Sequence, residues 1–201
     1  MAVSSVQIAN MALSKIGVRS KIESLTEANA EAREINLWFL TTREQTLEAF
    51  DWSFARKRLT LAAHADDPPE DVWGYRYQYP ADCIIIRKLQ NPTIPDDEAD
   101  AIPYQIEVDD AKETLSILTN LEDAVAIYTF NLSTTDLYSK LFIEVFATFL
   151  SSRIAFTLTG DKDIANTQFE QGFIMLAQAS AINANQQVDK PPREAEWIRG
   201  R

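Results

Sequence analysis

Cysteine, histidine and glycine are scarce in this chain. One cysteine, Cys83, and one histidine, His64, occur among 201 residues. A single cysteine cannot form an internal disulfide, and one histidine without further histidine or cysteine ligands makes no metal site. The five glycines are scattered singly, which excludes a glycine-rich phosphate-binding loop. We therefore expect no cofactor, a buried Cys83 on a strand and an exposed His64 in a loop.

Positive charge is also in short supply. Lysine and arginine number 19 against 30 acids, so the net charge is −11. Such a surface repels the phosphates of DNA and RNA and the head groups of anionic membranes. The one basic cluster is Arg56, Lys57 and Arg58, which we expect to contact carboxylates of a neighbouring chain rather than DNA.

The longest apolar stretch, residues 141–158, contains charges. Glu144 and Arg153 interrupt it, which argues against a membrane span. We interpret both as charges at a helix boundary or at a contact between subunits. The acidic run Asp96, Asp97, Glu98 and Asp100 lacks the glycine turn of a calcium-binding loop, so we expect a solvated loop there.

Four segments have the residue spacing of amphipathic helices. Ser4 or Ser5 can cap the first helix and Gly17 suits its end, while Asp136 can cap the third and Gly160 ends it. The third helix is apolar on most sides and should be buried, in the core or between subunits. The expected ranges are about 4–17, 26–51, 136–158 and 161–186. The inner face expected for the fourth helix is Ala165, Phe169, Phe173, Leu176, Ser180 and Ala184.

Between residues 52 and 130 helical spacing gives way to short alternating runs separated by proline, aspartate and asparagine. This pattern is typical of strands joined by turns. The sequence therefore predicts a mainly α protein, in which an antiparallel helix bundle contains one small inserted antiparallel β-sheet. A single domain is expected over residues 1–188, followed by an extended C-terminal tail.

The tail, residues 189–201, has a different character. Pro191 and Pro192 stop a helix and favour an extended chain. Trp197 and Ile198 are large apolar residues near a chain end, where they reduce solubility unless they dock. We expect this tail to bind another chain through its aromatic anchor, and packing onto its own domain is the alternative.

Two stretches carry a resemblance to a known family. The first reads IANMALSKIG over residues 8–17 and continues to Ser24-Leu25-Thr26-Glu27. The second reads AFDWSFA over residues 49–55 and continues through Trp73, Tyr75-Arg76-Tyr77 and Tyr79-Pro80-Ala81-Asp82-Cys83. In this order they resemble the head-to-tail adaptor proteins of tailed bacteriophages, also called tail accessory factors or tubular tail protein A. The resemblance runs from about Ile8 to Leu158, and more loosely includes the ending Trp197-Ile198-Arg199.

This resemblance implies a structural subunit of the virion, built in the host cytoplasm. It implies a ring of twelve copies beneath the portal protein, which extends the DNA channel and carries a downstream tail or nozzle protein. DNA would be passing cargo, and an acidic channel would let it slide, since phosphate contacts create grip. Portal contact by the family's C-terminal segment assigns docking, to the portal or to a neighbouring subunit, to Pro191, Pro192, Trp197, Ile198 and Arg199.

Two other functions stay open. A virion-associated cell-wall hydrolase could use Glu144 as a buried acid with a raised pKa, or a pair of carboxylates from the acidic loop. No matching catalytic constellation is visible, so we assign no catalytic residue and expect no enzyme. A cellular scaffold unrelated to phage is the third hypothesis.

Overall fold

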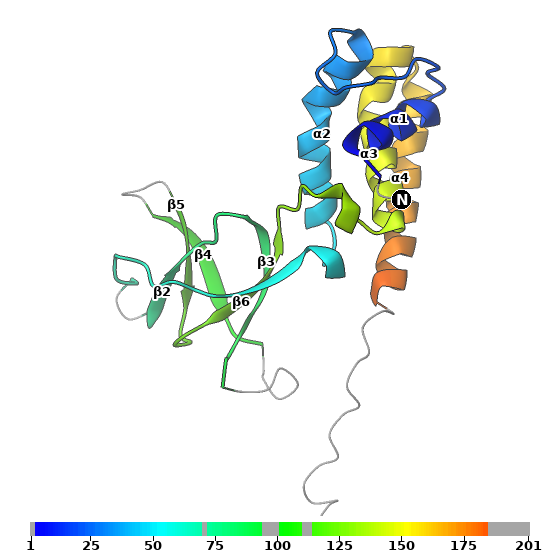
Figure 1. The fold of residues 1–201 in the computed structure, drawn as a ribbon. Coiled ribbons are helices and arrows are strands. Elements are labelled where there is room, and N and C mark those ends of the chain that lie inside the picture. Colours follow the sequence, from blue (N-terminus) through cyan, green and yellow to red (C-terminus); the bar gives the residue numbers. More distant parts are fainter. Residues whose placement is uncertain (1–2, 70–71, 94–100, 110–113, 185–201) are drawn as a thin grey trace, which may run out of the picture.

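The computed structural model describes residues 3–69, 72–93, 101–109 and 114–184 (Figure 1). Along the chain, two α-helices come first, six strands follow, and two further α-helices come last. The helices are α1 (Ser5–Lys15), α2 (Ala30–Glu48), α3 (Lys140–Thr159) and α4 (Lys162–Ala184). The strands are β1 (Arg56–Thr60), β2 (Tyr75–Gln78), β3 (Cys83–Gln90), β4 (Tyr104–Asp109), β5 (Thr114–Thr119) and β6 (Val125–Phe130).

The expected fold class, mainly α with one small sheet, is wrong. Of the described residues, 47% are helical and 21% lie in strands, so the fold mixes α and β. The strands form two antiparallel three-stranded sheets, ordered β1-β6-β3 and β2-β5-β4. They bury an apolar cluster of their own, with Tyr77 and Ile117 from one sheet and Ile86 and Tyr128 from the other. The β part is therefore a second body and not a minor insertion.

The centre of the helical body is α3. It packs against α1, α2 and α4, and Figure 1 shows α2 and α4 on either side of it. Phe142, Phe146, Leu150 and Ile154 are fully buried along it. By length and composition α3 could cross a membrane. Its place among three other helices explains the apolar composition without a membrane, because a helix buried on most sides is apolar all round.

The ends of the helices follow their capping residues. Ser4 caps α1 as expected, because its Oγ accepts a hydrogen bond from the Gln7 amide at 3.2 Å. Gly17 and Gly160 both adopt positive φ, 78° and 72°, as expected at the ends of helices. Two helices begin later than expected. Asn29 caps α2, so that helix starts at 30 and not 26, and Ser139 caps α3, which starts at 140 and not 136.

The fourth helix is rotated relative to the expectation. Gly172 and Ala179 face the core, whereas Phe169 and Phe173 are 50% and 53% exposed. The prediction that both phenylalanines lie on the inner face is therefore wrong. A small residue at the centre of the contact brings α4 close to α3 and leaves the larger rings at its side.

Candidate functional site

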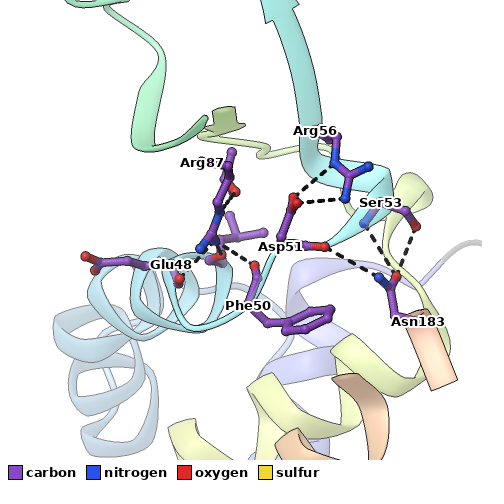
Figure 2. Close-up of polar contacts among 9 residues, drawn as sticks. Glu48, Phe50, Asp51, Ser53, Arg56, Arg87 and Asn183 are labelled. Atoms are coloured by element: carbon purple, nitrogen blue, oxygen red, sulfur yellow. Dashed lines mark hydrogen bonds and ion pairs between the residues drawn. The ribbon is translucent and has the colours of Figure 1, made fainter. Parts of the chain in front are cut away.

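At the junction between the two bodies, one arginine caps the end of a helix. Arg87 extends from β3 toward the C-terminal end of α2 (Figure 2). Its Nη2 donates to the carbonyl oxygens of Glu48 and Phe50 at 2.9 and 2.7 Å, and to that of Leu47 at 3.2 Å. The last carbonyls of a helix lack partners within the helix and carry partial negative charge, so a guanidinium is a fitting cap. Burial lowers the pKa of Arg87.

A second set of contacts joins the same junction to the end of α4. The carboxylate of Asp51 accepts two hydrogen bonds from Arg56, from Nε to Oδ1 at 3.1 Å and from Nη2 to Oδ2 at 2.7 Å. Asn183 is buried, and its Oδ1 accepts a hydrogen bond from the Ser53 hydroxyl at 3.0 Å (Figure 2). The ends of α2 and α4 and the start of β1 are thereby fixed to one another.

An apolar groove lies between α2, α3 and α4, with a cavity of about 150 Å³. Three phenylalanine rings form one wall, with the Phe169 and Phe173 centroids 4.9 Å apart and those of Phe149 and Phe173 5.3 Å apart. Its rim carries Arg153, whose Nη2 donates to Gln45 Oε1 at 2.6 Å and whose guanidinium lies 5.1 Å from the Trp38 ring centroid. The lining residues are Thr42, Gln45, Thr46, Ala49, Phe149, Ser152, Arg153, Phe169, Phe173 and Leu176.

One residue that lines the groove has an unsatisfied polar atom. Thr42 is 1% exposed, and its Oγ1 has no hydrogen-bond partner within the described part of the chain. Nearby Thr46 differs, because its hydroxyl donates to the Thr42 carbonyl at 2.7 Å. A buried hydroxyl without a partner is uncommon, and this one is enclosed by the protein and not open to the groove.

The outer surface of α4 lacks charge over its second half. From Gln171 to the end of the helix at Ala184 no residue is charged. Ile174 and Ile182 are 51% and 49% exposed there. We call Ile174, Ala177, Gln178, Ala181 and Ile182 the uncharged α4 face; all five are exposed. Exposed helix faces normally carry charge, so this one has the composition of a contact surface.

A second exposed apolar pair lies on α2, on the other side of α3. Leu37 and Leu40 are 65% and 52% exposed. They are three residues apart and so share one face of the helix. That face turns away from the groove, because Thr42 and Thr46, which line the groove, lie about 120–180° around the helix from both leucines at 100° per residue.

The residues predicted for contacts between subunits do not form one site. Arg56 pairs with Asp51, and Arg58 donates to Gln90 at 3.2 Å. Lys57 donates to Asp82 at 2.6 Å, and this hydrogen bond lowers the pKa of Asp82. Each cation therefore has a partner in its own chain, and so do Glu144 and Arg153. The predicted docking residues Pro191, Pro192, Trp197, Ile198 and Arg199 lie outside the described residues.

Glu144 is not the buried acid that the hydrolase hypothesis requires. Its carboxylate accepts a hydrogen bond from Lys15 Nζ at 2.9 Å, and its side chain is 46% exposed. The acidic loop of Asp96 to Asp100 lies outside the described residues. Within the ranges that are described, no three His, Cys, Asp or Glu side chains are grouped so as to hold a metal ion.

The two rare reactive residues lie in the β body. Cys83 begins β3 and is half-buried, and burial raises the pKa of its thiol to about 11. A thiol with such a pKa is a weak nucleophile at neutral pH. His64 is not exposed as expected: its side chain is 6% exposed, and its Nδ1 accepts a hydrogen bond from the Asp66 amide at 3.1 Å.

The sequence pattern missed the residues that shape the junction and the groove. Arg87 is an interruption in the apolar run of β3, and Asn183 is the polar residue that α4 buries at its end. Gly172 is an isolated glycine inside a helix, which is a signal of close packing. Thr42 gives no such signal, because threonine is common on helix surfaces.

The comparisons with known proteins give no family. No protein-family model matches the chain, and no curated protein sequence matches it. The functional argument therefore depends on the surfaces of this molecule and on the two sequence stretches described above.

Proposed function

We propose that this chain is a structural ring subunit that joins the head of a tailed bacteriophage to its tail, beneath the portal protein. The observation that carries the proposal is the uncharged α4 face. An exposed helix half with two isoleucines and no charge over Gln171 to Ala184 is unfavourable in water unless another chain covers it.

The position of the apolar surfaces supports a ring. The uncharged α4 face and the Leu37–Leu40 pair lie on elements at opposite sides of α3. When one surface of a chain contacts a different surface of the next copy, the contact is heterologous, and it closes into a ring if the rotation permits. We propose that α4 of each copy packs against α2 of the next.

The remaining features agree with an adaptor. The net charge of −11 suits a channel through which DNA passes without adhering. In this proposal the tail, residues 189–201, docks to the portal or to a neighbouring subunit, and the opposite end of the ring carries the downstream tail or nozzle protein. The proposal places the chain in the virion, after assembly in the host cytoplasm.

Mass measurement of the chain, alone and mixed with the portal protein of the same phage, tests the proposal. We expect the mixture to contain portal with a full ring of adaptor chains. A chain truncated after Lys190 should fold, because every described core residue precedes residue 185, but should no longer dock. Circular dichroism of the truncated chain controls for folding. Full docking by that chain, or no binding by either chain, would contradict the proposal.

A further inference from the structure

The groove between α2, α3 and α4 has the size and lining of a site for one aromatic side chain. Its cavity of about 150 Å³ is walled by Phe149, Phe169 and Phe173. An engineered apolar cavity of about the same volume binds benzene. Because the groove is open on one side, a ring larger than benzene can enter it edge first. Two of its phenylalanines, Phe169 and Phe173, are half exposed.

The tail offers one aromatic side chain for this groove. Trp197 is the only aromatic residue in the sequence from 185 to 201. Its indole has a large apolar face, which suits a groove walled by three phenylalanine rings. Its single N–H donor can stay in contact with water at the open side of the groove.

We propose that the groove binds the indole of Trp197 from the C-terminal segment of the same chain, with the ring against Phe149, Phe169 and Phe173. This segment begins directly after α4 ends at Ala184. Phe173 lies eleven residues before that end, about 16 Å back along the helix. The 13 residues from 185 to 197 can span up to about 43 Å when extended, so the indole can return to the groove.

Tethering favours the chain's own tail over a neighbour's. A short flexible tether holds its end at an effective concentration in the millimolar range. The tail of another chain, present at micromolar concentration, therefore occupies the groove less often than the tethered tail does. The inference goes beyond the proposed function and does not depend on it. In an adaptor, the groove would hold the tail until the portal offers a tighter site.

Disulfide trapping in the full-length chain tests the inference. With Cys83→Ser as background, cysteines are placed at Ala49 on the groove rim and at Ala195 near Trp197. The control pair is Leu40→Cys with Ala195→Cys, because Leu40 is exposed on the side of α2 that faces away from the groove. We expect a disulfide within one chain to form at least about tenfold faster in the Ala49 pair than in the control pair. The tether is the same in both pairs, so the difference reports the bound Trp197, which holds residue 195 beside the rim.

Two further substitutions separate the contacts. Trp197→Ala should reduce the rate of the Ala49 pair to that of the control. Phe173→Ala removes one wall of the groove and should also slow it, because the indole loses a ring contact. Equal rates in the two pairs, no effect of Trp197→Ala, or disulfides that join two chains instead of one would each overturn the inference.

A second measurement needs no added cysteine. The chain has four tryptophans, and Trp197→Phe assigns the indole N–H resonance of Trp197 in the full-length protein. We expect that resonance to be shifted from the position of a free indole, and to return toward it in Phe173→Ala. A wild-type resonance at the free position would overturn the inference.

Discussion

At the scale of single residues, Gly172 decides how closely α4 approaches α3. A Cβ at this position would lie 2.5 Å from Cε1 and 2.7 Å from Cδ1 of Phe149. Non-bonded carbon atoms do not approach this closely, so the ring or the helix must move. Phe149 also walls the groove, so the same glycine shapes the candidate binding site.

We expect Gly172→Ala to destabilise the protein by up to about 2 kcal/mol. Overpacking costs about 1–3 kcal/mol, and the higher helix propensity of alanine offsets about 1 kcal/mol of it. Urea denaturation measures the difference. In a background of Phe149→Leu, which shortens the opposing side chain, the same substitution should cost less, because contacting sites are coupled. A more stable Gly172→Ala protein would show that the two helices are not in close contact there.

At the scale of elements, the junction joins a helix end to a sheet through Arg87. Three carbonyl oxygens at the C-terminal end of α2 accept from its Nη2, and its Nε donates to Thr129 on β6 at 2.9 Å. Arg87 therefore ties the end of α2 to β3 and β6, and Asn131, directly after β6, adds hydrogen bonds with Arg43 and Glu44 on α2. Trp52 supports the same end, because its indole donates to the Thr46 carbonyl at 2.8 Å.

We expect Arg87→Met to lower the free energy of unfolding by about 2–3 kcal/mol. Methionine fills much of the same space but leaves the carbonyls without a charged donor. A hydrogen bond to a charged group contributes about 1.5–3 kcal/mol to stability. Lys88→Met, one residue along β3 and exposed, is the matched control and should have little effect. Urea denaturation gives both values, and hydrogen exchange in the last turn of α2 should rise in Arg87→Met alone. Equal losses in the two variants would mean that Arg87 contributes no more than an ordinary surface cation.

Elements were predictable from the sequence where the signal is local. The capping of α1 by Ser4 and the break at Gly160 depend on neighbouring residues, and both are confirmed. The pairing of β1 with β6 joins Arg56 to Thr129, far apart in the chain, and no local pattern indicates it. The rotation of α4 was missed because phenylalanine at helical spacing indicates a buried face, whereas here the close contact at Gly172 sets the orientation. The groove follows from that rotation, so it could not be predicted either.

At the scale of the whole molecule, the fold class was misjudged because a second core was not counted. Short strands with few apolar residues each appear minor when read one at a time. Together they bury Tyr77, Ile86, Ile117 and Tyr128 in one cluster, separate from the core around α3. The molecule therefore has two bodies joined at Arg87, Asp51 and Asn183, and its exposed apolar surface is concentrated on the helices and on the second sheet.

The ring proposal makes its sharpest prediction on the uncharged α4 face. Ile174→Glu places a charge on this face, and burying that charge against a neighbouring chain would cost several kcal/mol. The free chain should stay folded, because Ile174 is 51% exposed in it. Asn166→Glu, an exposed position in the charged first half of α4, introduces the same carboxylate as a control. Mass measurement with portal should show rings for the control and none for Ile174→Glu. Intact rings from Ile174→Glu would place the contact between subunits on another surface, because a carboxylate cannot be buried there without a partner.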